Sequence, residues 1–351
     1  MHLVSASNLL LIVLFIAASA IIWIAGKKIT YATDDIAASL KLGEAFGGLV
    51  LLAIVTNLPE IAITTVAAWN NDLDIAISNI LGGIAIQTVV LVLIDIFGVG
   101  KSSTLTFKSS SYLLLLEGIA LIFILTLVLI GKQFSPDFIF FRTTPFEWLI
   151  VLVWLGSIYL ISRQSTHPNP HPRKGVYPHS GSREKKGDKN HVLYYPSLQK
   201  ALLVFFVCAI ATLVAGWTLE ETGSLLADRF HMSGVLFGAT ILALSTSLPE
   251  ISTGIASARI KDYQMAVSDI FGGNAFLPVL FIVASLISGN AVLPDLKASD
   301  SYLTGIGILL TGIYMIGIIL PNKKQIGRMG IDSLLVLLVY LASLAGLVIL
   351  S

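Results

Sequence analysis

Two glutamates stand in otherwise apolar stretches of the chain, and they are the residues most able to do chemistry. Glu60 ends the run Val-Thr-Asn-Leu-Pro-Glu, and Glu250 ends the run Ser-Thr-Ser-Leu-Pro-Glu. An ionisable side chain inside a membrane-like apolar stretch is costly and marks a functional site by default. Brought together, the two carboxylates form a compact site of charge −2. Such a site suits one divalent cation, or monovalent cations or protons exchanged against it, so the pair is the predicted metal-binding centre.

Residues with side-chain oxygens precede each glutamate by three and four positions, a spacing that places them on the same helical face. Hydroxyl and amide oxygens are neutral hard ligands of the kind that Ca²⁺ and Na⁺ prefer over nitrogen or sulfur. The sequence therefore predicts that these side chains join the cation site. They are Thr56, Asn57, Thr246 and Ser247.

A proline precedes each glutamate and interrupts the helix that carries it. Pro59 and Pro249 cannot donate a backbone hydrogen bond, so each frees the carbonyl four residues back, at Val55 and Ser245. A bare carbonyl at membrane depth is tolerated where it lines a cavity or an ion site. The alternative is that the prolines only kink core helices, and their occurrence in register beside both glutamates argues against it.

A second pair of segments supplies further candidates. Asn79, Gly83 and Gln87 recur at intervals of four residues, and the corresponding triplet in the second half is Asp269, Gly273 and Leu277. Gln87 and Asp269 are predicted to reach the cation path, with Ser78, Asn79 and Ser268 as further oxygen donors. The glycines also permit close helix packing. Two other acidic residues, Asp95 and Glu117, have no acidic counterpart and are predicted to be local hydrogen-bonding groups.

The elements that position these residues are membrane-spanning helices. The chain has 351 residues, of which 55% are hydrophobic and 12% charged, half the charge content of a soluble domain. Its net charge of +1 is too small for a nucleic-acid-binding face, and the single cysteine excludes a disulfide framework. Runs long enough to cross a bilayer are 9–26, 46–69, 75–97, 112–130, 146–161, 198–218, 234–258, 265–287, 302–320 and 331–350.

The positions of lysine and arginine predict how these ten helices are oriented. The loops after the odd-numbered spans hold 18 of the 22 basic residues and the opposite side holds 4, so the basic loops are expected in the cytoplasm and both termini outside it. The central polar segment 163–197 is the predicted cytoplasmic linker. Four histidines in it are candidates for a regulatory metal, although solvated histidines need no ligand; they are His167, His171, His179 and His191.

The chain contains an internal repeat. Leu58-Pro59-Glu60 recurs as Leu248-Pro249-Glu250, and the same shift, applied without gaps, aligns five spans with five spans. Because five is odd, the second copy enters the membrane from the opposite face. The predicted fold is thus all-α: a first five-helix repeat over 1–162 and an inverted second repeat over 198–351. Inverted repeats are typical of transporters, with the substrate site near the midplane.

The doubled motif resembles that of the sodium/calcium exchanger family of Ca²⁺:cation antiporters, over essentially all ten spans. The resemblance implies that ions bind among spans two, three, seven and eight, and that the first and sixth helices move past the rest. It also implies cation ligation by Thr56, Glu60, Thr246, Ser247 and Glu250, with Asn57 in the place of a serine. Backbone carbonyls near Ala53 and Ala243 are implied to join them.

The sequence departs from that family's pattern in its Gly-Ser-Asn-rich stretches, which read Gly82-Gly83-Ile84 and Gly272-Gly273-Asn274 here. The polar ligand that follows is matched by Gln87 in the first repeat and replaced by Leu277 in the second. One coordinating oxygen is therefore lost. This makes proton coupling through the two glutamates a rival to Na⁺ coupling, because a buried carboxyl group holds its proton at higher pH than an exposed one.

The predicted function is a secondary antiporter exchanging Ca²⁺ for Na⁺, with H⁺ coupling as the alternative. We expect an integral protein of a prokaryotic plasma membrane, whose partners are lipid and the transported cations, with no cofactor. An intramembrane aspartyl protease is disfavoured because the strong pair is Glu–Glu and lacks a Gly-Asp motif. A passive channel is disfavoured because neither repeated subunits nor a filter loop is apparent.

Overall fold

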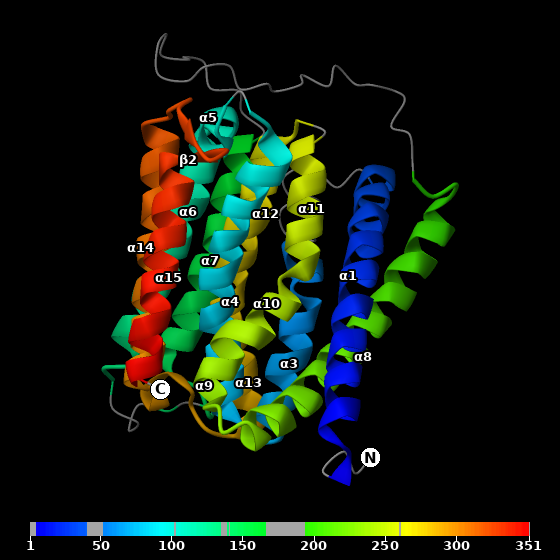
Figure 1. Cartoon of the computed structure of the whole chain (residues 1–351), viewed down its shortest axis with the longest axis vertical. Coiled ribbons are helices and arrows are strands. Elements are labelled where there is room, and N and C mark those ends of the chain that lie inside the picture. The colour runs from blue at the N-terminus through cyan, green and yellow to red at the C-terminus, as the bar shows by residue number, and fades with distance from the viewer. Residues whose placement is uncertain are drawn as a thin grey trace.

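The computed structural model describes residues 5–40, 52–101, 103–134, 139, 141–165, 194–259 and 261–350, and in these ranges the chain is a helical bundle with one two-stranded hairpin (Figure 1). The first-half elements are α1 (Asn8–Ser39), α2 (Leu52–Thr56), α3 (Leu58–Trp69), α4 (Leu73–Ile94), η3 (Asp95–Val99), α5 (Leu105–Ser109), α6 (Tyr112–Gly131) and α7 (Pro145–Ser165). The second-half elements are α8 (Leu198–Arg229), α9 (Gly234–Phe237), η5 (Gly238–Leu242), α10 (Ala243–Thr246), α11 (Leu248–Arg259), α12 (Tyr263–Phe276), η6 (Leu277–Val279), α13 (Leu280–Ser288), η7 (Leu293–Asp295), α14 (Ala298–Ile319), β1 (Gln325–Ile326), β2 (Met329–Gly330) and α15 (Ile331–Leu350).

Eight of the described helical stretches are long and apolar enough to cross a membrane, and the pair 234–246 and 248–259, bent by 43°, would make a ninth. The span expected over 46–69 is described from residue 52 onward, as α2 and α3. The chain is therefore an integral membrane protein, while the expected count of ten spans stays a prediction. Most of the predicted linker, 166–193 with its four histidines, lies outside the described residues.

Two helices are longer than the sequence predicts. The span expected to end at Gly26 continues as α1 to Ser39, and the span expected to end at Thr218 continues as α8 to Arg229. The predicted ends lie where charged residues interrupt the apolar run. Charged residues end a membrane-buried segment without ending a helix, since Lys and Glu are good helix formers.

The spacing of the sequence repeat recurs in the helix boundaries. The shift that carries Glu60 onto Glu250 also carries both ends of α1 onto those of α8, both ends of α3 onto those of α11, and the start of α4 onto that of α12. The turns between these helices match as well. Asn71 and Lys261 have left-handed φ values of 58° and 68°, and the next residues, Asp72 and Asp262, cap α4 and α12 with their side chains.

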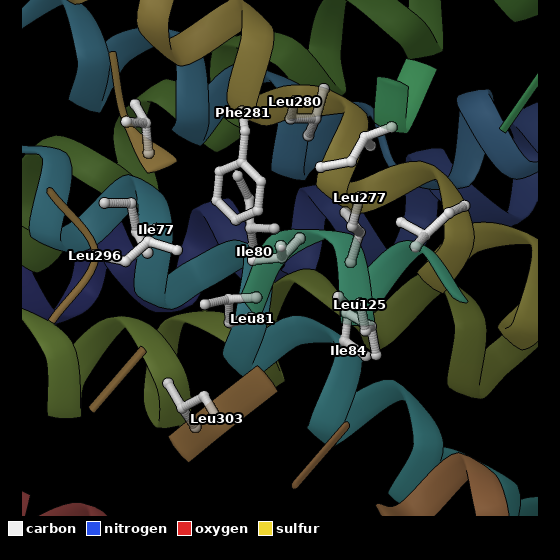
Figure 2. Packing of buried hydrophobic residues seen from close by; sticks show 14 of the residues in the cluster. Ile77, Ile80, Leu81, Ile84, Leu125, Leu277, Leu280, Phe281, Leu296 and Leu303 are labelled. Atoms are coloured by element: carbon white, nitrogen blue, oxygen red, sulfur yellow. The ribbon is translucent and has the colours of Figure 1, made fainter. Parts of the chain in front are cut away.

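α4 and the α12–α13 segment form the centre of the bundle and are largely buried, whereas α7, α8 and α15 expose much of their apolar surface. Figure 2 shows the packing at this centre, where Ile80, Leu81 and Ile84 of α4 lie in one cluster with Leu277 and Phe281. The two central elements come from opposite halves of the chain, so each half completes the core of the other.

α1 and α8 pack along each other at one side of the bundle (Figure 1). Each crosses the proline-bearing helix of the other half at a glycine. A Cβ on Gly26 would lie 2.7 Å from the Cβ of Pro249, and one on Gly216 would lie 3.1 Å from the carbonyl oxygen of Pro59. Glycine is therefore required at both crossings.

The α1–α8 pair is also tied together at both ends. Near the end of α1 the Asp35 carboxylate accepts hydrogen bonds from the backbone N–H groups of Tyr194 (3.2 Å) and Tyr195 (2.7 Å), just before α8. At the other end, Arg229 donates to the carbonyl of Ala6 and to the side-chain oxygen of Asn8, both at 2.7 Å. These bonds hold the two helices as one unit.

Candidate functional site

Each of the two glutamates lies just after a break in its helix. The helix stops after Thr56 and after Thr246, and resumes at Leu58 and Leu248 with proline as the second residue. Proline is tolerated there because the first turn of a helix has no partners for its N–H groups. Glu60 and Glu250 are thus the third residues of α3 and α11, where the positive end of the helix dipole stabilises a carboxylate.

The two glutamate side chains come together in the interior. They are 0% and 1% exposed, and Glu250 lies within electrostatic range of Glu60 and of Asp269. The side chain of Thr246, from the second half, approaches the Glu60 carboxylate. The structure therefore brings the predicted pair to one place and builds that place from both halves of the chain.

The carboxylate oxygens at this site have few hydrogen-bond donors. Among the described residues, Gln87 donates its amide N–H to Oε1 of Glu60 at 3.2 Å. Oε2 of Glu60 has no partner there, and no described residue donates to either carboxylate oxygen of Glu250. A buried carboxylate without donors is strongly unfavourable, so a bound cation or a proton is the natural counterpart of these oxygens.

Side-chain oxygens from both halves lie buried at the helix breaks that precede the two glutamates. Thr246 and Ser247 both donate their hydroxyl hydrogens to the carbonyl of Ala243, at 3.0 and 2.8 Å. The Thr246 hydroxyl also lies within hydrogen-bonding reach of the Glu60 carboxylate. Whichever oxygen takes the hydrogen, a hydroxyl keeps lone pairs that a cation can use. Thr56 and Asn57 are buried in the first half at the corresponding positions. Ala53 lies in α2, and its backbone is one turn before this break.

Gln87 is the α4 residue that enters the site. Its amide nitrogen contacts Asn57 Oδ1 (3.4 Å) as well as Glu60, and its amide oxygen has no hydrogen-bond partner among the described residues. Gly273 of α12 makes room for this group, since a Cβ there would lie 3.0 Å from Asn57 Nδ2 and 3.7 Å from Gln87 Oε1. The glycine in the second half thus admits side chains of the first half.

The equivalent position in the second half is apolar. Leu277 is fully buried in the central hydrophobic cluster, and a Cβ on Gly83 would lie 3.4 Å from its Cδ1. The methyl groups of Leu277 therefore pack beside Gly83 in the second half, whereas the amide of Gln87 packs beside Gly273 in the first. The two halves differ here in chemistry and also in backbone, because α4 continues past Gln87 whereas α12 ends at Phe276 and is followed by η6 with Pro278.

Asp269, on α12, lies near Glu250. Its Oδ2 accepts a hydrogen bond from the Thr253 hydroxyl at 3.0 Å, and the residue is 7% exposed. Thr253 is three residues beyond Glu250 and was not singled out in the sequence, because its position is isoleucine in the first half. The counterpart of Asp269 is Asn79, which is buried with both amide atoms unpartnered among the described residues.

The prediction for Asp95 is confirmed. Its carboxylate accepts hydrogen bonds at 2.7 Å from the backbone N–H groups of Leu105 and Gly330 and from the Ser333 hydroxyl, and so joins three segments at one end of the bundle. Glu117 accepts one hydrogen bond, from Ser268 at 2.8 Å.

In the part of the chain that the structure describes, no three His, Cys, Asp or Glu side chains gather closely enough to hold a metal ion. A cation at the glutamate pair would therefore rest on two carboxylates and on neutral oxygens. Four further buried acids are not apparent from the sequence, namely Asp35, Glu147, Glu220 and Asp300. All four stand near or beyond the ends of the predicted spans, where an acidic residue is expected to be solvated.

The comparisons with known proteins point to the same family as the doubled motif. A model of the family described as "Sodium/calcium exchanger protein" matches residues 10–162 and 200–349. The chain is 26% identical to "Putative antiporter CaxA" of Alkalimonas amylolytica over 284 residues, which is 80% of this chain and 82% of that one. It is 23% identical to "Inner membrane protein YrbG" of Escherichia coli over 314 residues, 82% of this chain and 90% of that one.

Two solved proteins share the fold. A structure of the sodium-calcium exchanger NCX_Mj superposes with a TM-score of 0.63 at 17% identity, covering 97% of this chain and 99% of that chain. The structure of native YfkE superposes with a TM-score of 0.65 at 16% identity, covering 98% of each chain.

Proposed function

Because the chain belongs to the sodium/calcium exchanger protein family and is a transmembrane antiporter of that family, we propose that it exchanges Ca²⁺ for Na⁺ across the membrane by alternating access. The observation that carries this proposal is the meeting of two buried glutamates, one from each half, with three of their four carboxylate oxygens lacking a hydrogen-bond partner among the described residues. Two hard anionic ligands with neutral oxygens around them suit Ca²⁺.

The proposed architecture is ten membrane-spanning helices in two inverted five-helix repeats, with both termini outside the cytoplasm. The helix boundaries that correspond between the two halves under one constant shift support the duplication. Both termini lie at the same end of the bundle (Figure 1), as an even number of spans requires. The excess of lysine and arginine in the loops at the other end supports a cytoplasmic location for that end.

In the proposed mechanism, Glu60 and Glu250 bind one Ca²⁺ together and cancel its charge. Thr56, Asn57, Thr246, Ser247 and Gln87 add neutral oxygens, with the backbone carbonyls near Ala53 and Ala243, and Asp269 lies along the path. When the pair is unloaded it carries two negative charges at low dielectric, and moving those charges past apolar side chains is costly. Only loaded states therefore change sides, and this requirement couples the two cation flows.

Proton coupling is the second candidate, and Leu277 is the observation that favours it. With methyl groups in place of an amide and no side chain at Gly83 or Gly273, the site has fewer oxygens for Na⁺ than the family pattern provides. Each glutamate binds a proton through one carboxylate oxygen, so proton binding needs no further ligands. Two protons replacing one Ca²⁺ leave the site equally neutral.

The experiment is uptake of radioactive calcium into inverted membrane vesicles under an imposed Na⁺ gradient or an imposed pH gradient. Ca²⁺ uptake driven by Na⁺ supports the first proposal, and uptake driven by the pH gradient alone supports the second. E250Q removes one charge without changing shape and is expected to abolish both activities. The matched control is E221Q, which removes the charge of a half-buried glutamate outside the pair. Absence of calcium uptake under both gradients, with E250Q without effect, overturns the proposal.

A further inference from the structure

A second group of acidic residues lies where the last turns of α8 meet the turn after α3. α8 has 32 residues and is about 48 Å long at 1.5 Å per residue, well beyond a hydrocarbon thickness of about 30 Å. Its last turns therefore project toward the membrane surface, at the end of the molecule where both termini lie (Figure 1). The residues involved are Asn70 and Asp72 after α3, and Glu220 and Ser224 on α8.

Glu220 is the residue of this group that points to a ligand. It is 1% exposed, and its Oε2 has no hydrogen-bond partner among the described residues. Its electrostatic neighbours are the acids Asp72 and Glu221, and the Asn70 side chain reaches it. A carboxylate that is buried beside other carboxylates without a cationic partner is strongly unfavourable. A bound cation or a proton would relieve this cost, and the neutral oxygens of Asn70 and Ser224 nearby suit a cation.

Asp72 is a second carboxylate of this group without a basic partner among the described residues. Its Oδ2 accepts a hydrogen bond from the Ser224 hydroxyl at 3.4 Å. Burial, and to a lesser extent the nearby charges of Asp74 and Asp228, raise the pKa of Asp72 above its ordinary value. The described ion pair in this region joins Lys297 to Asp74, and within the described ranges no basic side chain pairs with Asp72 or Glu220.

The group lies at one end of a stripe that leads toward the glutamate pair. Thr212, Gly216, Glu220 and Ser224 follow at intervals of four residues and share a face of α8. That face is turned to α3, because a Cβ on Gly216 would meet Pro59 at 3.1 Å and because Ser224 bonds to Asp72. Pro59 immediately precedes Glu60, so the stripe reaches the helix break at the central site.

We propose that Glu220 and Asp72, with the side-chain oxygens of Asn70 and Ser224, bind a divalent cation at the end of the molecule where the termini lie, before it passes to the central pair. Two carboxylates and two neutral oxygens are hard ligands, and the remaining positions belong to water, as is common for Ca²⁺. That the cation is the transported one rests on the proposed function, whereas the binding site itself does not.

Binding is tested on purified protein in which E60Q and E250Q together remove the central site. The measurement is the melting temperature in CaCl₂ against choline chloride of equal ionic strength. A ligand that binds the folded state stabilises it, so we expect a Ca²⁺-dependent rise of about 3 °C. Adding E220Q should remove that rise, whereas adding D262N, at the exposed start of α12, should keep it. No rise in the double variant, or equal loss with E220Q and D262N, overturns the proposal.

If E220Q prevents folding, Asn70→Ala takes its place, since Asn70 is exposed and its truncation leaves the helix packing intact. It is expected to reduce the Ca²⁺-dependent rise, and an unchanged rise contradicts the site.

The role in transport is tested in vesicles of both orientations with the central glutamates intact. E220Q should raise the KM for Ca²⁺ about tenfold, the effect of losing about 1.4 kcal/mol of binding, only when Ca²⁺ is supplied at the end with the termini. The rate at saturating Ca²⁺ should not change. A KM raised equally from both sides, or equally by D262N, contradicts this role. The binding test uses a variant that lacks the central pair, so its result can be interpreted even if the protein does not exchange Ca²⁺ for Na⁺.

Discussion

The two halves of the cation site share a helix break before each glutamate and differ in the side chains around it. Glu60 receives a hydrogen bond from Gln87, whereas the position equivalent to Gln87 beside Glu250 is the buried Leu277. Glu250 has Asp269 in its vicinity instead, while the equivalent of Asp269 is Asn79. The first half thus contributes neutral amides and the second contributes negative charge. A duplicated backbone fixes where two carboxylates meet, and the residues one helix away decide how each is compensated.

The largest effect is expected from substitution of the two glutamates, which are the feature that both halves share. E60Q and E250Q should each reduce cation exchange at least about a hundredfold, because losing one ligand of a buried charge-neutral site costs about 3 kcal/mol or more. The measurement is the initial rate of Ca²⁺ uptake at matched protein levels, with E221Q as the control. If one of the two variants retains normal exchange, the two carboxylates do not share one ion.

The next substitution makes the second half resemble the first. Leu277→Gln places an amide among the apolar side chains of the central cluster and should destabilise the protein by about 2 kcal/mol, seen as a lower melting temperature. The added oxygen should also strengthen stabilisation by Na⁺ relative to choline. Leu277→Met keeps the volume and serves as the control. A Na⁺ response unchanged by Leu277→Gln would mean that this position does not face the ions.

The converse substitution makes the first half resemble the second. Gln87→Leu removes the donor to Glu60 and an amide oxygen, and should raise the KM for Ca²⁺ about tenfold, since hydrogen bonds to charged groups contribute about 1.5–3 kcal/mol. Gln87→Glu keeps an oxygen there and should affect the KM less in the same vesicle assay. Equal effects of both variants would assign Gln87 a packing role only.

The smallest effect is expected at Asp269. Asp269→Asn keeps an oxygen that can accept the Thr253 hydrogen bond and removes only a charge beside Glu250. We expect a rise in KM of about threefold, corresponding to about 0.7 kcal/mol. Asp262→Asn, at the exposed start of α12, controls for loss of any carboxylate on that helix. A hundredfold effect at Asp269 would show that it is a direct ligand.

Much of the site could be predicted from the sequence because its information is local and repeated. The Leu-Pro-Glu motif fixes a helix break and a carboxylate within one short run, and its recurrence at the matching place in the second half indicates that the two copies face each other. Gln87 could be predicted from its spacing within α4.

The missed features depend on contacts between distant segments. Glu220 looks like a solvated residue past the end of an apolar run, and it is buried only because α8 continues to Arg229 and lies against the turn after α3. The hydrogen bond from Thr253 to Asp269 has no counterpart in the first half. Neither hydrophobic periodicity nor the repeat carries that information.

The length of α1 and α8 makes their tilt depend on the thickness of the bilayer. Each is about 48 Å long, each is tied to the other at both ends by Asp35 and Arg229, and α8 is visibly inclined to the bundle (Figure 1). A helix longer than the hydrocarbon layer accommodates it by tilting. We therefore expect short-chain lipids to increase the tilt of the pair and long-chain lipids to reduce it. The rate of exchange should follow acyl-chain length in reconstituted vesicles.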